Sequence, residues 1–282
     1  MQSIAKILLP VDFSERSVGA ARYARILADR FHSEITLLHS VTPLPYEFGA
    51  LEGGGAMLSE IYSDRAQQIE TELNCFLLQE LAGCQVKRVT LEGDPAQRIV
   101  EYAHAENVNL IVMPTHGYGT FRRFILGSNT AKVLHDAECP VWTGVHIQDG
   151  PVQGPVAIRS ILCAIDLGPQ TCKTLTWAAA MQREFGARLT VIHGMACRDD
   201  PAAEELERSV REEVARFGKS AGVEAELLLE TGDASKVVCE AADRTAADLL
   251  VIGRGSAAGG FGRLRTHAYA MIRQSPCPVV SV

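Results

Sequence analysis

The chain has 282 residues, 47% of them hydrophobic and 22% charged, which fits two ordinary-sized domains with buried cores and excludes a disordered protein. The formal net charge of −7 argues against binding to nucleic acid or to an acidic membrane, because both need a basic surface. A small anion such as ATP is compatible with this charge, since backbone N–H groups can bind phosphate on an acidic protein.

The N-terminal segment lacks the basic and then apolar build of a signal peptide, and its apolar run stops at Asp12. No later stretch is apolar over the length that a membrane span requires. The eight cysteines form no C-x-x-C pair and no histidine cluster accompanies them, so a structural zinc site is not expected. We therefore predict a cytoplasmic protein with reduced, mostly buried thiols, and with no membrane or nucleic-acid partner.

Each half of the chain is predicted to fold, in chain order, as strand, helix, strand, long helix, strand, helix, strand, helix and strand. The strands are short, apolar and rich in β-branched residues, as at 7–11, 35–41 and 110–113. Between the first two strands, the spacing i, i+4, i+7, i+11 marks one face of a helix in both halves: Ala20, Ala24, Leu27 and Phe31, then Thr174, Ala178, Met181 and Phe185. Apolar strands that alternate with helices indicate a mostly parallel sheet covered on both faces.

The second half repeats the first. Segments match in the same order, at an offset of 154 residues early in each half and of 138 or 139 later: KILLPVDFS (6–14) with SILCAIDLG (160–168), EITLLHSV (34–41) with RLTVIHGM (188–195), LEGDPAQRIVEYA (91–103) with ETGDASKVVCEAA (230–242), NLIVMP (109–114) with DLLVIG (248–253), and AECPVWTGV (137–145) with SPCPVVSV (275–282). Chance does not easily produce so many ordered matches, so the chain is a tandem duplication. The residues that the second half lacks fall in the segment 43–57.

Glycines and prolines in 146–157 interrupt any regular element and mark the junction. We divide the chain into a domain at 1–147, a linker at 148–157 and a domain at 158–282. The predicted fold class is α/β, with two tandem, open, five-stranded, mostly parallel sheets and helices on both faces, a Rossmann-like arrangement. The last strand of each domain, at 141–145 and 278–282, is short and apolar, and an uncovered sheet edge of this kind invites another strand.

Open parallel sheets bind ligands beyond the carboxyl ends of their strands, where the strand order reverses. Three segments of the first half are expected to meet there: Pro10-Val11-Asp12, His39-Ser40-Val41, and Met113-Pro114-Thr115-His116-Gly117, the last followed, after nine intervening residues, by Gly127-Ser128-Asn129. A carboxylate at the end of the first strand suits a ribose hydroxyl or an adenine amino group. Glycines let the backbone approach a phosphate, and a serine at a helix start adds N–H groups, a hydroxyl and the positive end of the helix.

Asp12 has a second, equally weighted interpretation as a local cap of the first helix, with Ser14 or Ser17 as further capping candidates. Its repeat mate Asp166 persists where the phosphate loop does not, which supports this local role. His39 and His193 also match across the repeat, and we expect packed, hydrogen-bonded histidines rather than catalysts or metal ligands.

At these residues the chain resembles the universal stress protein family in its tandem form, over nearly its whole length. ATP-binding members carry G-x-x-G-x9-G-S/T after the fourth strand, and the segment 114–128 fits all but the first position, where Pro114 replaces glycine. The resemblance implies an adenine nucleotide α-hydrolase-like fold whose two domains meet through their last strands, as a pseudo-twofold dimer within one chain. A further homodimer of two chains is also expected.

The resemblance also implies how a nucleotide is held. Adenine and ribose are assigned to Asp12 and to the backbone near Pro10, Val11 and Val41, and the phosphates to Gly117, Gly127, Ser128 and Asn129, with Met113, Pro114 and His116 lining the same pocket. Proline at 114 removes one N–H donor and forbids positive φ. If that amide binds phosphate, its loss costs about 1.5–3 kcal/mol; if the position only shapes the turn, little is lost. Arg122 and Arg123 are interpreted as surface residues, or alternatively as partners of the outer phosphates.

The second half departs further from the family pattern. Arg265 stands opposite Gly127 and Thr266 opposite Ser128, so we predict a structural and regulatory partner without a tight ATP site. Arg265 or Arg254 is a candidate to fill the phosphate position with its own guanidinium or to recruit another anion. Cys139 and Cys277, each in a Cys-Pro-Val run, are expected to be buried small residues.

The leading functional hypothesis is a nucleotide-binding stress-response protein. Its N-terminal half would hold ATP, with or without Mg²⁺, as a switch of conformation or of partner binding. The alternatives are a scaffold of the same fold that has lost nucleotide binding, and a slow ATPase. The motifs G-x-x-x-x-G-K-[ST] and H-E-x-x-H do not occur, so fast hydrolysis is not expected.

Overall fold

The computed structural model describes residues 4–42, 55–115, 126–144, 157–195, 201–221, 225–254 and 263–282. The first half comprises β1 (Lys6–Pro10), α1 (Glu15–Phe31), β2 (Glu34–Val41), α2 (Gly55–Cys75), β3 (Gln85–Glu92), α3 (Pro95–Ala105), β4 (Leu110–Val112), α4 (Ser128–Asp136) and β5 (Val141–Thr143). The second half comprises β6 (Ser160–Ile165), α5 (Thr171–Phe185), β7 (Arg188–Met195), α6 (Pro201–Ala221), β8 (Glu226–Thr231), α7 (Ala234–Arg244), β9 (Leu249–Ile252), α8 (Arg263–Gln274) and β10 (Val279–Ser281). Both halves follow the predicted succession of strands and helices.

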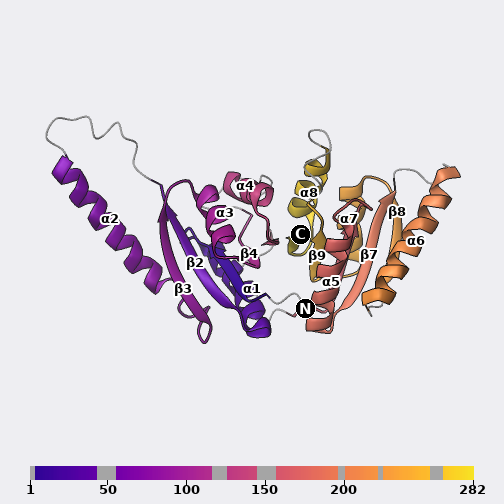
Figure 1. Cartoon of the computed structure of the whole chain (residues 1–282), viewed down its shortest axis with the longest axis horizontal. Coiled ribbons are helices and arrows are strands. Elements are labelled where there is room, and N and C mark those ends of the chain that lie inside the picture. Colours follow the sequence, from indigo (N-terminus) through magenta and orange to yellow (C-terminus); the bar gives the residue numbers. More distant parts are fainter. Residues whose placement is uncertain are drawn as a thin grey trace.

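The ten strands form one sheet in the order β3-β2-β1-β4-β5-β10-β9-β6-β7-β8. Neighbouring strands within each half are parallel. β5 and β10 pair antiparallel, with Val280 opposite Trp142. The predicted pairing of the last strands is confirmed, and it makes the two five-stranded sheets continuous. Because the second half reverses the strand order of the first, a pseudo-twofold axis passes between β5 and β10 (Figure 1).

The first and fourth strands each end one residue earlier than predicted, at Pro10 and Val112. The amide of Val11 still donates to Leu38 O at 2.9 Å, but Phe13 adopts a left-handed φ of 62° and turns the chain away from the sheet. Asp12 therefore lies in the turn beyond the strand rather than at its last position.

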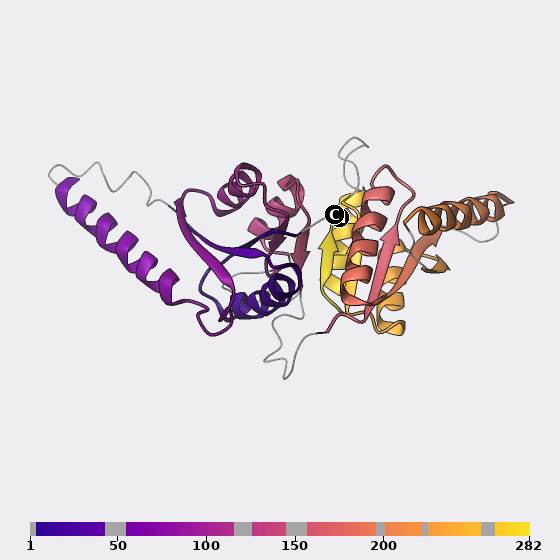
Figure 2. The same cartoon turned by 60° about the horizontal axis from the view of Figure 1, so that its bottom comes forward.

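Alternate residues of each strand fill a separate core on each face of the sheet. Ile7 and Leu9 of β1 join the core under α1, α2, α5 and α6, whereas Leu8 joins the core under α3, α4, α7 and α8. Each core includes residues of both halves, so an apolar core continues across the seam on each face of the sheet. In Figures 1 and 2, α2 and α6 lie at opposite ends of the long axis, beside the edge strands β3 and β8.

The same polar contacts recur in both halves. Asn109 Oδ1 accepts two backbone N–H groups at the start of β1, each at 2.9 Å, and Asp248 Oδ2 does so at the start of β6, at 2.8 and 3.0 Å. Asp94 and Asp233 cap α3 and α7 by accepting the N–H of the residue three positions on. The duplication has thus kept the local folding signals as well as the apolar pattern.

The carboxyl-terminal ends of α1 and α5 meet across the seam. The rings of Phe31 and Phe185 pack edge to face, with centroids 6.2 Å apart. Arg30 pairs with Glu184, whose Oε2 lies 3.5 Å from the arginine Nε. These contacts join the two halves on one face of the sheet, while β5 and β10 join them within it.

Candidate nucleotide-binding site

The Asp12 carboxylate holds the turn after β1. Its Oδ1 accepts hydrogen bonds from the Ser14 N–H at 3.1 Å, from the Ser14 hydroxyl at 2.6 Å and from the Ser17 hydroxyl at 3.1 Å. Ser14 stands at the N-cap position of α1 but makes no side-chain cap bond. The expectation of a serine cap at Ser14 is wrong, because its hydroxyl donates to Asp12 instead of accepting from the helix.

The second half builds the same turn. Asp166 Oδ1 accepts from the Gly168 N–H at 2.8 Å and from the Thr171 hydroxyl at 3.4 Å. Leu167 adopts a φ of 58°, close to the 62° of Phe13, although a left-handed non-glycine residue costs roughly 1–2 kcal/mol. Because this turn recurs with its carboxylate, local folding alone accounts for the persistence of Asp166.

Both matched histidines are hydrogen-bonded to the end of the first strand of their half. His39 Nδ1 lies 2.9 Å from Val11 O, and His193 Nδ1 lies 2.9 Å from Ile165 O. A carbonyl oxygen only accepts, so Nδ1 carries the hydrogen and Nε2 is the acceptor of the neutral ring. The prediction of packed, hydrogen-bonded histidines is confirmed.

The structure brings the predicted strand-end residues to one edge of the sheet. Pro10 and Val11 end or follow β1, Val41 ends β2, and Met113 follows β4, and these three strands are neighbours. Several of their backbone groups are already used. Val41 O accepts the N–H of Gly93 at 2.9 Å, and the Met113 amide donates to Trp142 O at 3.0 Å. A base edge at this place would therefore meet a largely satisfied backbone.

The start of α4 is tied to the end of β4. Gly127 is the N-cap, with φ −59°, and its amide donates to Thr115 O at 2.9 Å. The buried Thr130 donates its hydroxyl to Pro114 O at 3.1 Å. Sequence reasoning missed both contacts. A threonine in the first turn of a predicted helix was the available signal for the second of them.

Ser128 and Asn129 supply the first two amides of α4. The intrahelical ladder offers no acceptor to amides at these positions, and the glycine N-cap provides no side-chain oxygen. Among the described residues at this edge of the sheet, these two N–H groups are candidates to donate to a phosphate.

Pro114 replaces a glycine that does not need left-handed backbone. Its repeat mate Gly253 is not among the positive-φ residues. A Cβ added to Gly253 would lie 3.1 Å from Thr174 Oγ1, so close approach to α5 is what favours glycine there. The matched residue in α1 is the smaller Ala20. This favours the interpretation in which position 114 shapes the turn at negative φ.

Four residues of the predicted loop, His116, Gly117, Arg122 and Arg123, lie outside the described residues. Their assignment to a phosphate pocket stays a prediction.

The second half contains a cavity of about 210 Å³ at the carboxyl ends of β6, β7 and β9. Its lining includes Ile165, Asp166, His193, Gly194, Gly253 and His267. Mostly apolar walls with a few polar groups are typical of small-molecule sites. The second half has therefore kept room for a small ligand although its loop departs from the family pattern.

Arg254 does not line this cavity. Its guanidinium crosses to the first half, where it donates to Ala137 O and Cys139 O, and it also donates to Ser281 O at 3.3 Å. The expectation that Arg254 fills the phosphate position of its own half is wrong, because the backbone carbonyls at the end of α4 bind it instead. Arg265 lies in the first turn of α8, and the structure describes only its backbone.

The two matched thiols differ in burial. Burial raises the pKa of Cys277 to about 11, and the prediction that it is a buried small residue is confirmed. Cys139 is only partly buried; burial raises its pKa, and the nearby Arg254 opposes this rise. A raised pKa leaves both thiols protonated at neutral pH, which disfavours nucleophilic chemistry.

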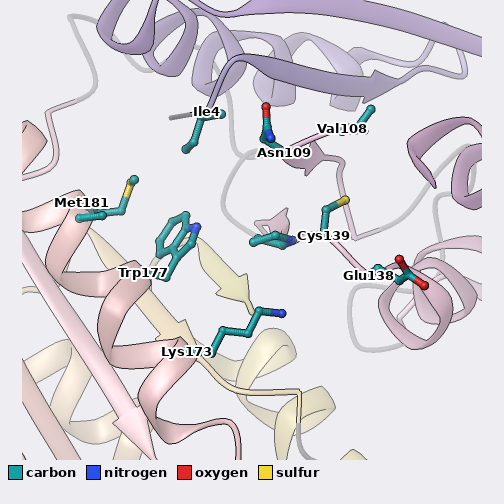
Figure 3. Close-up of a pocket in the computed structure, with 10 residues that line it drawn as sticks. Ile4, Val108, Asn109, Glu138, Cys139, Lys173, Trp177 and Met181 are labelled. Atoms are coloured by element: carbon teal, nitrogen blue, oxygen red, sulfur yellow. The ribbon is translucent and has the colours of Figure 1, made fainter. Parts of the chain in front are cut away.

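A second cavity, of about 200 Å³, lies at the seam between the halves. Figure 3 shows Cys139 of the first half opposite Lys173 and Trp177 of α5. Burial, followed by the charge of Arg254, lowers the pKa of Lys173. The cavity marks the place where α5 packs against the segment that joins α4 to β5.

Within the described ranges, no cluster of three or more histidine, cysteine, aspartate or glutamate side chains could hold a metal ion. Among the helices of that part of the chain, none is both long and apolar enough to cross a membrane.

The model of the universal stress protein family matches residues 3–143 and 157–282, which is nearly the whole of both halves. The chain belongs to the universal stress protein family. Universal stress protein MJ0531 of Methanocaldococcus jannaschii is 33% identical over 136 residues, which is 48% of this chain and 79% of that protein. A Thermus aquaticus universal stress protein is 31% identical over 136 residues, 48% of this chain and 94% of that one.

A solved structure of another universal stress protein shares the fold of this chain over both halves. A universal stress protein from Archaeoglobus fulgidus DSM 4304 covers 99% of this chain and 96% of its own, with a TM-score of 0.70 and 23% identity. This match establishes the fold of both halves together. A universal stress protein solved in complex with cAMP covers 45% of this chain and 97% of its own, with 22% identity and a TM-score of 0.40.

Proposed function

We propose that this universal stress protein binds ATP in its N-terminal half and uses it as a switch of conformation or of partner binding in stress response. One observation carries the proposal: Asp12, the ends of β1, β2 and β4, and the uncapped start of α4 all lie at one edge of the sheet. Parallel sheets of this kind bind nucleotides at such an edge.

Among the described residues, one group binds the ribose and another binds the phosphates. The carboxylate of Asp12 accepts from ribose, while the amides of Ser128 and Asn129 donate to phosphate at the positive end of α4. Because the Gly127 amide is used by Thr115, Gly127 contributes close approach rather than a donor. Mg²⁺, where present, is held chiefly by the phosphates themselves.

Isothermal titration of ATP into the nucleotide-free full chain tests the proposal. Gly127→Leu should fold, because φ −59° suits any residue, but its side chain should enter the phosphate position and lower ATP affinity at least about tenfold. The matched control is Arg265→Ala in the second half, which should leave affinity unchanged. No heat of binding at millimolar ATP in the wild-type protein would overturn the proposal.

A scaffold function without nucleotide is the second candidate, and two observations favour it. Pro114 has no N–H and the Gly127 amide donates to Thr115 O, so neither residue offers an amide to a phosphate. Native mass spectrometry of protein purified without added ligand separates the candidates: a scaffold carries no nucleotide at any protein concentration. Slow hydrolysis is a variant of the first candidate, and radiolabelled ATP left intact after long incubation would exclude it.

Assembly and location complete the proposal. The division at 148–157 separates two domains that already pair through β5 and β10, and the strands β3 and β8 remain at the outer edges of the sheet. Open edges invite further pairing, so we propose a homodimer of whole chains in the cytoplasm. Light scattering at micromolar concentration should give twice the chain mass; a single-chain mass would refute the dimer.

A further inference from the structure

Two side chains of the second half donate hydrogen bonds to α4 of the first half and to the residues that follow it. The guanidinium of Arg254 binds the carbonyls of Ala137 and Cys139, at the point where α4 ends and the chain leads into β5. The hydroxyl of Tyr269, from α8, donates to Ala131 O at 3.2 Å. Figure 1 shows α4 and α8 facing each other across the middle of the molecule.

In each of these contacts the side chain comes from the second half and the backbone carbonyl from the first. The repeat mate of Arg254 is Thr115, which is fully buried and whose carbonyl accepts from Gly127 within its own half. The mate of Tyr269 is Ala131, which has no polar side chain. The first half therefore has no equivalent side chains with which to hold α8. The second half thus holds the residues at the end of α4 through position 254, which the pattern G-x-x-G leaves free to vary.

The chemistry suits the end of a helix. The carbonyl of Ala137, the C-cap of α4, lacks an intrahelical partner and lies at the negative end of the helix dipole, so the partly buried guanidinium of Arg254 satisfies both needs. Arginine offers a planar fork that binds two carbonyls at once, which lysine does not. At its other end, α4 is fixed to β4 by Thr130 and Gly127. The short helix is thus held at both ends, and its first amides are set in place.

We propose that Arg254 is a positioning residue for the phosphate site of the first half: by holding the end of α4 from the second half, it orients the amides of Ser128 and Asn129. This inference rests on the proposed ATP binding. It assigns a role to the second domain that does not require a ligand of its own. Affinity for phosphates depends on Arg254 through α4, whereas affinity for the nucleoside, which contacts Asp12 and the strand ends, does not.

The test compares ATP and adenosine on the full chain. Arg254→Ala should weaken ATP binding about tenfold while adenosine affinity stays within about twofold of wild type. Arg254→Lys should lie between, since it keeps the charge but loses the fork. The matched control is Arg244→Ala, an exposed arginine of the same half whose partner Glu230 lies 2.6 Å away and which should leave both affinities unchanged. In ligand-free protein, hydrogen exchange over 128–136 should rise in Arg254→Ala but not in the control.

Each outcome of the ATP and adenosine comparison supports or overturns the inference. Equal ATP affinity in wild type and Arg254→Ala would overturn the inference and leave the proposed function standing, as would a loss of ATP and adenosine in the same proportion. Failure of the wild-type chain to bind ATP would overturn both. Should Arg254→Ala not fold, Arg254→Lys decides instead: it must weaken ATP binding more than adenosine binding, and equal effects on the two ligands would overturn the inference.

Discussion

A single carboxylate illustrates how folding and binding overlap at the residue scale. Asp12 accepts three hydrogen bonds within its turn, and Asp166 accepts two in the matched turn. Asp12→Ala should therefore lower the free energy of unfolding by about 1–2 kcal/mol, and Asp166→Ala by about 1 kcal/mol. Urea unfolding of both variants measures these changes.

Titration of the same two variants with ATP separates the roles of the carboxylate. Asp12→Ala should weaken ATP binding because it also removes the ribose acceptor, whereas Asp166→Ala should not. If both variants are destabilised but bind ATP like wild type, Asp12 is a folding residue only, and the ribose assignment is wrong.

At the scale of single elements, the end of α7 gives a prediction in which a substitution raises the free energy of unfolding. Ala246 follows α7 with a left-handed φ of 46°, where the first half has Asn107 at 53°. The N–H groups of residue 246 and its successor close hydrogen bonds of 3.0 and 2.9 Å onto α7, the geometry that favours glycine. Because Ala246 is exposed, Ala246→Gly should raise the free energy of unfolding by about 0.5–1 kcal/mol. The control Ala215→Gly, exposed within α6, should lower it by about 1 kcal/mol.

The elements themselves follow from the sequence because each rests on a periodic pattern. Ile7, Leu8 and Leu9 read as a strand buried on both faces, and α1 follows from Ala20, Ala24 and Leu27. Strand ends were less predictable, since nothing in the side chain of Phe13 announces a left-handed φ. Internal repeats compare each residue with its mate in the other half. They therefore show that the second loop is altered, but they do not show where the side chain of Arg254 lies.

Arg254 makes that limit concrete. Its carbonyl partners lie 117 and 115 positions away along the chain, in the other half, and backbone carbonyls leave no trace in the sequence. Alignment of the repeats places Arg254 in the phosphate loop of its own half. That is its position in the sequence, but its guanidinium binds carbonyls of the other half. The Gly127 amide is a similar case: the motif assigned it to a phosphate, whereas its nearest acceptor is Thr115 O. Polar contacts that depend on the fold had to come from the structure.

At the scale of the whole molecule, duplication has placed a dimer interface inside one chain. The antiparallel pairing of β5 with β10 makes one sheet of ten strands, and each core includes buried apolar residues of both halves. An apolar seam of this kind should make the two halves unfold together. The two tryptophans of the chain report on it directly, because Trp142 lies in β5 and Trp177 of α5 lines the seam cavity.

Val280→Asp tests this cooperativity. Val280 is fully buried and stands opposite Trp142 in the antiparallel pair, so its replacement places an unpaired carboxylate in an apolar seam, at a cost of about 3–5 kcal/mol. The seam should open before either half unfolds: tryptophan emission should shift to the red at low urea, ahead of the loss of helical circular dichroism. In wild type and in the control Thr231→Asp, at the exposed end of the edge strand β8, the two signals should coincide. Coincident signals in Val280→Asp would mean that β5 and β10 do not hold the halves together.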